Sequence, residues 1–449
     1  MPTFTDVACP ACGCVCDDLT LTTDGTRVIR AERACALAEP WFLAQSSVTR
    51  PDAEVEGTPT DLGTAVARTV ELLRRADNPL IYGLSRSSTG GQRAAVKLAD
   101  LLGATIDTTA SLCHGPSIMA VQAVGESTCS LGEIRTRADL VIFWGCNPAE
   151  THPRHAERYS VFPRSEWLPN GRADRTVVMI GDRREVHDWR LDRAGAQADW
   201  VIPLEPDRDL EAITMLRALV RRISRPVETG NVNGPGDPFY DTALTEHLIE
   251  LAERMKSCRC GVVFFGLGLT ASDLRRAPSS SRLGHLNVEV LLRLVAELND
   301  HTRFHARRMR LHGDVTGADS VLCWQTGYPF SVNLSRGYPR YNPGEFSAND
   351  LLTRGEPDLC VIIGSETLPQ FAPQSLDHLR RIPTILLDYP AAKPIIAPTV
   401  RITTAPYGLH ASGTAYRMDE VPIPFKASLP THLPTDEVVL DDVAERLEL

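Results

Sequence analysis

Short apolar runs alternate with amphipathic segments along most of the chain. Runs typical of buried strands lie at 80–83, 140–144, 177–180, 200–202, 261–268, 359–363 and 384–387. Between them, apolar residues recur with helical spacing at 65–75, 92–102 and 286–298. Apolar strands that alternate with helices are typical of parallel sheets covered by helices on both faces. The pattern therefore predicts an α/β fold with doubly wound parallel sheets.

Breaks in this alternation divide the chain into four predicted segments. The first, 1–55, is rich in cysteine, and the second, 56–225, is an α/β lobe. A second α/β lobe with a long ordered loop follows over 226–350, and 351–449 is a C-terminal α/β return segment and tail. A polar stretch at 228–238 has the Gly and Pro content of a linker. The strand-and-helix series on its two sides are expected to form two similarly built lobes.

Residues 305–345 break the alternation most strongly. Glycine, proline and aromatic residues are too frequent there for a simple helix or strand, so we expect an ordered loop. Long ordered loops usually carry function. Its arginines are suited to hold anionic groups, and they are Arg307, Arg308, Arg310, Arg336 and Arg340. The alternative is a solvated basic edge, which the interleaved aromatic residues disfavour.

Composition is that of an ordinary globular protein and disfavours several functions. The chain has 449 residues, of which 43% are hydrophobic and 23% are charged. Its net charge of −10 disfavours a general nucleic-acid-binding surface. The lack of an 18-residue apolar run predicts no membrane span. The N-terminus lacks a secretory pattern, and the 12 cysteines then favour a reducing, cytoplasmic location.

Four of the five cysteines in the first 35 residues form the pattern Cys9-x2-Cys12-x3-Cys16-x18-Cys35, and Cys14 stands outside it as a bystander. In a reducing compartment such an array indicates a metal or cluster site rather than disulfides. Residues 17–34 have the pattern of a short hairpin, which would return the fourth cysteine to the first three. Four converging thiolates suit a [4Fe–4S] cluster. A structural zinc with four cysteine ligands is the main alternative, and unliganded thiols are a third.

A second candidate for chemistry is the pair Cys113-His114, which follows a Thr/Ser-rich stretch and opens a predicted helix. A thiol near a helix N-terminus has a lowered pKa and binds soft metals well. A neighbouring histidine is able to move protons near neutral pH. The simpler interpretation is a half-buried cysteine in a loop, and the local sequence alone favours it.

Polar residues and glycines follow several predicted strands, at the edge where parallel sheets bind ligands. The candidate cofactor-binding residues there are Gly145, Asn147, His152, Arg154, Asp182, Arg183, Gly266 and Gly268. The histidines and arginines near 145–155 could coordinate a metal ion or bind a phosphate group. A capped loop with polar surface residues explains them equally well. The acid and base at 182–183 suit a ribose and a phosphate, although this signal is weak alone. The glycines at 266–268 allow close approach of a ligand or simply form a turn.

These motifs together resemble the B subunit of formylmethanofuran dehydrogenase, including its version in the bacterial formyltransferase/hydrolase complex. The resemblance extends through nearly the whole chain. Its most specific part is Trp-Gln-Thr-Gly-Tyr-Pro at 324–329, with the segment 335–345 after it. The cysteine array, 113–116, 145–148, 152–160, 313–317 and 413–419 also fit the family.

The family is similar to formate dehydrogenases of the molybdopterin oxidoreductase superfamily. The resemblance implies α/β lobes around a tungsten or molybdenum bis-pterin guanine dinucleotide centre, beside a small N-terminal domain with a [4Fe–4S] cluster. By the same resemblance, Cys113 ligates the metal, His114 handles protons and Arg310 matches the active-site arginine. The implied cluster ligands are Cys9, Cys12, Cys16 and Cys35. The strand-end residues fall where the pterin dinucleotides lie.

The activity implied by the family is the reversible reduction of CO2 to formate, with electrons arriving singly through the cluster. Formate then passes to an A-type amidohydrolase subunit, which joins it to the amine of methanofuran in one-carbon metabolism. We therefore expect a multisubunit complex with A-type, C-type and D-type partners. The substrate is a small molecule.

One departure from the family supports an alternative. Relatives that transfer electrons carry a basic residue, usually lysine, shortly after the fourth cluster cysteine. Here residues 36–41, which follow Cys35, contain no lysine. The alternative is a redox-silent structural subunit of a formyltransferase/hydrolase complex that kept the fold and lost both cofactors. An unrelated zinc-bearing α/β binding protein is a remote third possibility, because 324–345 matches the family so specifically.

Overall fold

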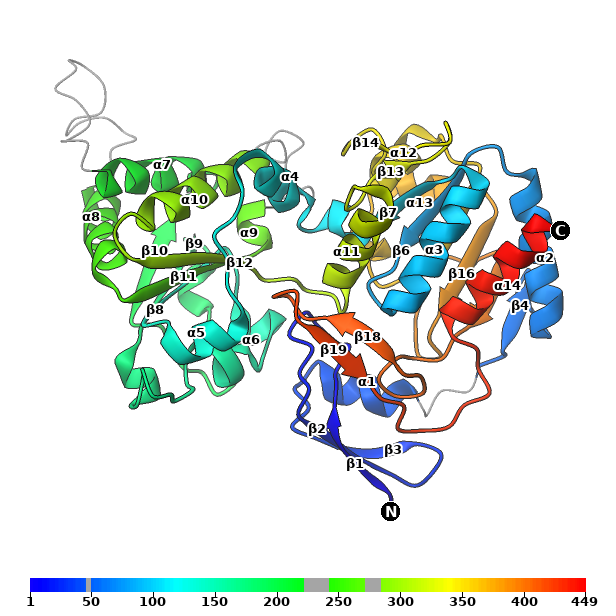
Figure 1. The fold of residues 1–449 in the computed structure, drawn as a ribbon, viewed down its shortest axis with the longest axis horizontal. Helices are drawn as coiled ribbons and strands as arrows, with labels where there is room; N and C mark the ends of the chain where they lie inside the picture. Colours follow the sequence, from blue (N-terminus) through cyan, green and yellow to red (C-terminus); the bar gives the residue numbers. More distant parts are fainter. Residues whose placement is uncertain (46–49, 222–241, 271–283) are drawn as a thin grey trace. The chain divides into compact units, whose positions relative to one another are not determined.

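The computed structural model describes the chain in two compact units. Unit 1 comprises residues 1–115 and 310–449, and unit 2 comprises 116–309 (Figure 1). The described residues are 1–45, 50–221, 242–270 and 284–449. The linker predicted at 228–238 lies outside them. Unit 1 combines both ends of the chain, and the four-segment division made from the sequence stays a prediction.

A nine-stranded mixed sheet is the centre of unit 1, in the order β14-β13-β7-β6-β15-β16-β17-β4-β5. Its parallel central strands are β7 (Thr105–Thr108), β6 (Pro79–Gly83), β15 (Leu359–Ile363), β16 (Thr384–Asp388) and β17 (Val400–Thr403). The antiparallel edge strands are β13 (Val332–Asn333), β14 (Arg340–Tyr341), β4 (Ala53–Val55) and β5 (Thr58–Thr60). All residues of β6, β15 and β16 are buried, as continuous apolar runs predict for strands covered on both faces.

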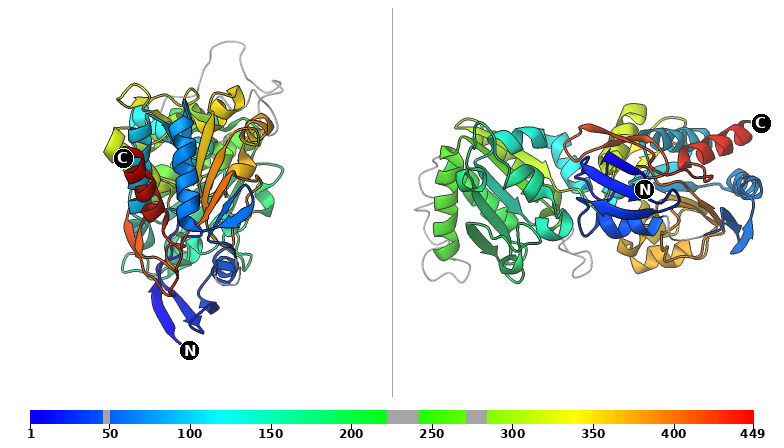
Figure 2. Two further views of the ribbon diagram at one scale, coloured as in Figure 1. Left: turned by 90° about the vertical axis from the view of Figure 1, so that its right-hand side faces the viewer. Right: turned by 90° about the horizontal axis from the view of Figure 1, so that it is seen from below.

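Helices cover both faces of this sheet, because alternate residues of each strand point to opposite faces. Ile81 and Val361 pack on one side with α2 (Leu62–Arg75), α3 (Thr89–Leu102), α11 (Val315–Thr326) and α14 (Asp436–Glu448). Leu80 and Ile362 pack on the other side with α12 (Ala348–Arg354) and α13 (Pro373–Leu379). The C-terminal α14, red in Figure 2, lies beside α3 and α2. The predicted helices at 65–75 and 92–102 are thus confirmed.

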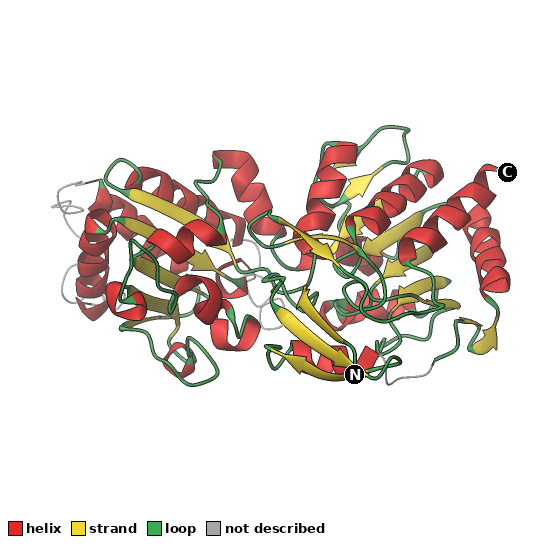
Figure 3. Cartoon of the chain, turned by 60° about the horizontal axis from the view of Figure 1, so that its bottom comes forward, coloured by secondary structure: helices red, strands yellow, loops and turns green. Residues whose placement is uncertain are grey.

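Unit 1 also contains the cysteine-rich N-terminus. Strands β1 (Thr3–Val7), β2 (Leu19–Thr23) and β3 (Val28–Glu32) form an antiparallel sheet near the N-terminus (Figure 3), which confirms the hairpin predicted over 17–34. Helix α1 (Ala38–Gln45) follows. The hairpin β18 (Gly413–Tyr416) and β19 (Pro422–Phe425) shares a core with Ala8 and Val15, which lie in the same segment as the first cysteines. A separate N-terminal domain is not confirmed.

Unit 2 is built on a parallel sheet in the order β10-β9-β8-β11-β12. The strands are β8 (Leu140–Trp144), β9 (Thr176–Asp182), β10 (Trp200–Leu204), β11 (Cys260–Phe265) and β12 (Arg303–Arg308). Helices α7 (Asp209–Val220), α8 (Thr242–Ser257) and α10 (Gly284–Leu298) share its main apolar core. Across the described ranges, no helix has the length and apolar character needed to cross a bilayer.

Strands of the two predicted series are interleaved in both sheets. In unit 1, β6 of the first series pairs with β15 of the second. In unit 2, β8 of the first series pairs with β11 of the second. The two series therefore do not form one sheet each. An apolar run shows that a strand is buried, but it does not specify the partner of that strand.

Regular structure occupies much of the segment predicted as an ordered loop at 305–345. Strand β12 ends at Arg308, and α11 runs from Val315 to Thr326. The helix forms because the Asp314 carboxylate caps it by accepting from the Gly317 N–H, and Gly327 ends it with a φ of +86°. The loop prediction holds for 309–314 and after Gly327, where the short β13 and β14 interrupt the irregular backbone.

Candidate functional site

Three of the four predicted cluster cysteines lie between β1 and β2, in residues 8–18, here called the cysteine loop. Cys14, which is not among the predicted ligands, lies in the same loop and is also buried. The Cys9 N–H donates to the Cys16 carbonyl at 2.8 Å, which closes this loop. Cys9, Cys12 and Cys16 are buried, and Cys35 is half-buried. Cys35 follows β3 and accepts from α1 through its own carbonyl, so the three-stranded sheet positions all four residues.

The four thiols interact with one another. Burial raises the pKa of Cys9 well above its usual value, and the thiols of Cys16, Cys12 and Cys35 raise it further. Burial also raises the pKa of Cys35, to which Cys12 and Cys16 contribute in the same direction. Thiolates that repel one another in this way are stabilised when a shared cation binds them. The thiols therefore have the placement expected of a common ligand set.

The chemistry of this ligand set suits an iron–sulfur cluster. A [4Fe–4S] cube is held by four soft thiolates around its corners, whereas one tetrahedral zinc draws its ligands much closer together. The soft, all-thiolate donor set thus fits the cluster, and four thiolates also suit the zinc alternative.

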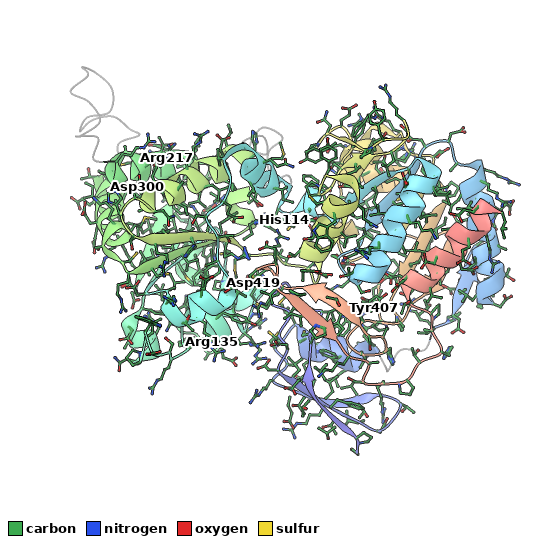
Figure 4. The ribbon with its side chains drawn as sticks, viewed as in Figure 1. His114, Arg135, Arg217, Asp300, Tyr407 and Asp419 are labelled. Carbon is green, nitrogen blue, oxygen red and sulfur yellow. The ribbon has the colours of Figure 1, made fainter. Side chains whose placement is uncertain are left out.

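Cys113 and His114 lie in unit 1, between the 3₁₀ turn η1 (Thr109–Leu112) and α4 (Gly115–Val124). Both side chains are buried, and the His114 Nδ1 is 3.3 Å from the Cys113 Sγ. Figure 4 labels His114 beside the start of α4. Cys113 is therefore neither exposed nor half-buried, contrary to the simpler interpretation of the sequence.

The predicted lowering of the Cys113 pKa by a helix N-terminus is wrong. Burial raises the pKa of this thiol to about 12. The Arg310 charge and the Leu311 main-chain N–H act in the opposite direction, and the Asp319 carboxylate raises the pKa further. Desolvation of the thiolate therefore raises the pKa more than the Arg310 charge and the Leu311 N–H lower it. In the absence of a bound cation, Cys113 is a neutral thiol.

Asp319 is a site residue that the sequence analysis missed. Its Oδ2 is 2.7 Å from the His114 Nε2, and its Oδ1 accepts from the Thr108 hydroxyl at 2.8 Å. It lies on the apolar face of α11, four residues after Val315 and three before Leu322. A carboxylate within such an apolar stripe is the signal that would have found it, because buried charges are rare unless they are paired.

Arg310 completes this buried group. Its Nη1 is 3.6 Å from the Asp319 Oδ2, and its Nη2 is 3.9 Å from Glu420. Its main-chain carbonyl accepts from the Gly13 N–H of the cysteine loop at 3.2 Å. Unit 1 thus brings three of the predicted catalytic and metal-binding groups together: Cys113-His114, Arg310 and the N-terminal cysteines.

The predicted glycines Gly145, Gly266 and Gly268 pack against one another in unit 2. The Gly268 N–H donates to the Gly145 carbonyl at 2.9 Å. A Cβ added at Gly145 would lie 2.7 Å from the Leu269 nitrogen, and one added at Gly266 would lie 2.5 Å from the Cys146 Cβ. Close packing of the loops after β8 and β11 explains why these positions are glycine, and their role in cofactor binding stays a prediction.

Asn147, His152 and Arg154 follow β8 and surround the short helix α6 (Pro148–Thr151). The Asn147 Oδ1 accepts from the Arg190 N–H at 3.3 Å. The buried His152 has its Nδ1 2.9 Å from the Thr151 hydroxyl. The Arg154 Nη2 pairs with Glu157 at 2.9 Å. These contacts are those of a capped polar loop, and none of them excludes a cofactor in this loop.

The neighbouring His155 is a core histidine. Its ring lies against Phe143, Phe264 and Tyr159. Burial lowers its pKa well below the usual value, and His152 acts in the same direction. A neutral imidazole within an aromatic core has a packing role that accounts for its position.

Asp182 and Arg183 lie at the end of β9, as predicted. The Asp182 carboxylate accepts from the main-chain N–H and the Nε of Arg184, each at 2.9 Å. Arg183 pairs with Glu205, which follows β10. A ribose or phosphate at this strand end would have to replace these exposed ion pairs. Their role in binding also stays a prediction.

Arg307 and Arg308 lie on β12 in unit 2. The Arg308 Nη2 pairs with the buried Glu126 Oε2 at 2.8 Å. The Arg307 Nη1 donates to the Thr128 hydroxyl at 2.7 Å. At these two positions the alternative of a solvated basic edge is wrong, because both side chains are buried.

The sequence is similar to those of characterised proteins. It is 38% identical over 426 residues to the B subunit of tungsten-containing formylmethanofuran dehydrogenase 2 from Methanocaldococcus jannaschii, covering 93% of this chain and 92% of that one. The corresponding protein from Methanococcus maripaludis is 36% identical over 430 residues, with 94% and 93% covered. The B subunit of the formyltransferase/hydrolase complex from Methylorubrum extorquens is 25% identical over 320 residues, with 70% and 75% covered. No family model matches the chain.

The fold is similar to that of a solved structure. One polypeptide of the Methylorubrum extorquens formyltransferase/hydrolase complex, determined with methylofuran, superposes with a TM-score of 0.68. The superposition covers 88% of this chain and 98% of that polypeptide, at 22% sequence identity. This similarity supports the α/β architecture and carries no conclusion about ligands.

Proposed function

This chain belongs to the family of formylmethanofuran dehydrogenase B subunits, and from this premise we propose that it is the redox subunit, which interconverts CO2 and formate. Its centre would be a tungsten or molybdenum bis-pterin guanine dinucleotide, with a [4Fe–4S] cluster nearby. The relatives from Methanocaldococcus and Methanococcus are named as tungsten-containing enzymes, which favours tungsten.

One observation carries this proposal: a thiol, an imidazole, a carboxylate and a guanidinium meet in the unit that also holds the four N-terminal cysteines. They belong to Cys113, His114, Asp319 and Arg310. Each residue as a whole, backbone included, is at most 6% exposed. Burial of four polar groups together is costly unless they are paired or serve chemistry.

Each group has a chemistry suited to its proposed role. The Cys113 Sγ would ligate the metal, because soft thiolates bind such ions and a bound cation strongly lowers a thiol pKa. The bound cofactors would supply the two-electron chemistry and the single-electron transfer. The Arg310 guanidinium is suited to orient the carboxylate of formate. The His114 ring is suited to hold or release a proton beside the sulfur.

The strand-end residues of unit 2 would contact the pterin dinucleotide. Asn147, His152 and Arg154 provide donors at the end of β8, where α/β sheets commonly bind ligands. Asp182 and Arg183 occupy the corresponding position on β9. The proposal for these residues rests on their strand-end placement and on the family resemblance.

The chain would work as part of an assembly. Formate would pass to an A-type amidohydrolase subunit, which joins it to the amine of methanofuran, and C-type and D-type subunits would complete the complex. The solved relative was determined as a four-subunit complex, which supports an assembly of this kind.

A redox-silent structural subunit is the alternative. It is favoured by residues 36–41, which follow Cys35, include the start of α1 and contain no lysine. In that case the thiols and the buried polar group would be remnants of an ancestral site.

Metal analysis and electron paramagnetic resonance of the purified complex separate the two functions. The redox subunit predicts about four iron atoms per chain together with tungsten or molybdenum. The structural subunit predicts an assembled complex without either. The Cys113→Ala variant should then lose CO2/formate activity. The variant Cys360→Ala is the matched control, since Cys360 is also a buried thiol of unit 1 and lies within β15. An unchanged rate in Cys113→Ala would contradict the proposal.

A further inference from the structure

Asp319 belongs to the buried group on which the proposed function rests, but no chemical role has been assigned to it above. Its Oδ2 lies 2.7 Å from the His114 Nε2, with side chains that are 7% and 5% exposed. The other ring nitrogen of His114, Nδ1, lies 3.3 Å from the Cys113 Sγ. The imidazole therefore links the carboxylate to the sulfur.

The chemistry of the carboxylate determines which ring nitrogen carries a proton. An ionised carboxylate only accepts hydrogen bonds, so the His114 Nε2 must donate. A neutral imidazole protonated at Nε2 has its lone pair on Nδ1, and this nitrogen then faces the sulfur as an acceptor. In the metal-free chain the buried thiol is the complementary donor. The contacts of all three side chains are therefore satisfied by a single tautomer. A metal-bound thiolate has no proton to donate, so the contact between His114 Nε2 and Asp319 alone would then orient the ring.

Asp319 is itself held from two directions. The Thr108 hydroxyl, at the end of β7, donates to its Oδ1 at 2.8 Å. The Arg310 Nη1 lies 3.6 Å from its Oδ2 and supplies an opposite charge. Because the carboxylate comes from α11 and its partners come from β7 and the chain after β12, its position is fixed by the packing of the unit rather than by local chain geometry.

A purely structural ion pair is the competing explanation. Helix α11 has its own cap at Asp314, and apart from Thr316 the residues that it buries beside Asp319 are apolar or glycine, with Val315 one turn before Asp319 and Leu322 one turn after it. An apolar residue in this position would usually stabilise the fold as well as a buried ion pair does, because two charges must be desolvated. Stability alone is therefore a weak reason for a carboxylate here.

We propose that Asp319 is a positioning residue, which fixes the His114 ring in the Nε2–H tautomer so that Nδ1 faces the Cys113 sulfur. Its kinetic consequence rests on the function proposed above, whereas the tautomer is a property of this chain alone. Groups that orient a metal-ligating histidine typically contribute about 10- to 100-fold to activity or affinity, and we expect an effect of this size for the histidine beside the proposed metal ligand.

Three variants of the full chain test the inference. Asp319→Asn keeps the shape but removes the charge and the acceptor-only character. Thr108→Val removes one anchor and leaves the carboxylate, so it is the milder test if the first variant folds poorly. Asp436→Asn is the matched control, because Asp436 is also buried in unit 1 but accepts from the hydroxyl of Tyr407, away from this group.

The direct readout is the ¹⁵N chemical shift of the two His114 ring nitrogens in histidine-labelled protein, assigned by loss of the signal in His114→Gln. The unaltered chain and Asp436→Asn should show a protonated Nε2 and an unprotonated Nδ1. Asp319→Asn should show a mixture of tautomers, and Thr108→Val a smaller shift in the same direction. An Nδ1–H tautomer in the unaltered chain, or shifts unaffected by both variants, would overturn the inference.

Activity of the assembled complex is the second readout. Asp319→Asn should lower the rate of formate oxidation about 10- to 100-fold, while Asp436→Asn retains it. If the unaltered complex does not interconvert CO2 and formate, the proposed function fails and the ¹⁵N result still decides the role of Asp319. If the complex is active and Asp319→Asn keeps its full rate, the positioning role is overturned and the proposed function stands.

Discussion

A methyl group added to Gly13 would lie 2.4 Å from the main-chain carbonyl oxygen of Arg310. The Gly13 N–H donates to that oxygen, and the Gly13 carbonyl accepts from the Met418 N–H at 2.8 Å. The cysteine loop is therefore bound by its main chain to the segment that carries Arg310 and to the C-terminal hairpin. Only glycine allows this approach, because the opposing atom is backbone and has little room to move.

The first prediction concerns Gly13→Ala. The added methyl must displace the cysteine loop or the Arg310 main chain, so we expect a loss of about 1–3 kcal/mol in the free energy of unfolding. The iron content of the purified complex should fall as well, because the loop holds three of the proposed ligands. Denaturant unfolding and iron analysis measure the two effects.

Gly132→Ala is the control for this substitution. A methyl group at Gly132 meets its nearest neighbour, the Ser130 hydroxyl oxygen, at 3.5 Å, and this position lies within α5 (Leu131–Arg137). Alanine favours helix over glycine, so the free energy of unfolding should stay constant or rise. If Gly13→Ala is equally well tolerated and keeps its iron, the contact does not constrain the cysteine loop.

The second prediction concerns the ion pair between Glu126 and Arg308 in unit 2. Their side chains are 6% and 10% exposed, and the atoms are 2.8 Å apart. Replacing Arg308 removes the charge that faces the buried Glu126 carboxylate, so Arg308→Met should lower the free energy of unfolding by roughly 3–5 kcal/mol. Denaturant unfolding of the full chain measures the change.

The double variant Glu126→Leu with Arg308→Met provides the comparison. Because both charges are removed, its unfolding free energy should lie closer to that of the unaltered chain than to that of the single variant. Additive losses in the two single variants would show that the pair does not interact as the structure indicates.

The strands were predictable from the sequence, but their pairing was not. Runs such as 140–144 and 359–363 are apolar at every position, and the structure places β8 and β15 there with the same bounds. The pairing of β6 with β15 joins residues far apart in the chain. No local pattern encodes that pairing, which depends on how the whole unit packs.

The candidate site was predictable only in part, for a similar reason. The cysteine spacing and Cys113-His114 are local patterns, and the structure gathers the groups they name in one unit. Asp319 escaped notice because its partners, His114 and Thr108, come from a distant segment. The sequence also did not predict α11, because the glycines near Asp314 favoured a loop there and the capping role of Asp314 was not recognised.

The third prediction is a pH dependence due to Asp314. Burial raises the pKa of this carboxyl from 3.8 to about 8. The unfolded chain releases the proton near pH 4, whereas the folded protein keeps it until about pH 8. Between these values the folded state binds more protons, so the free energy of unfolding falls as pH rises, by at most about 1.4 kcal/mol per pH unit.

Asp314→Asn should flatten this slope over the whole interval from pH 4 to pH 8. The asparagine oxygen still accepts from the main-chain N–H groups of Gly317 and Tyr416, and the neighbouring Gln92 amide is able to turn and accept from the new NH2. Burial raises the pKa of Asp388 only to about 6, so Asp388→Asn should flatten the slope only below pH 6. Urea unfolding at a series of pH values measures both slopes. Identical slopes in Asp314→Asn and the unaltered chain would contradict the assignment.

The fourth prediction concerns the reactivity of Cys113 in the metal-free chain. Because burial raises the pKa of its thiol to about 12, only about one molecule in 10⁴ carries the thiolate at pH 8. Alkylating reagents attack the thiolate and also need access to the sulfur. Cys323, which is exposed, should therefore react with iodoacetamide long before Cys113 does.

Peptide mass spectrometry after timed alkylation follows both sites in one sample, and Cys323→Ser confirms the assignment of the fast signal. Cys113 should become reactive only when denaturant unfolds the chain, because unfolding removes the burial that raises its pKa. If Cys113 were instead modified in the folded chain as fast as Cys323, the helix N-terminus and Arg310 would have to lower its pKa more than burial raises it. The thiol would then be activated by the protein itself, and a cation would not be needed to generate the thiolate.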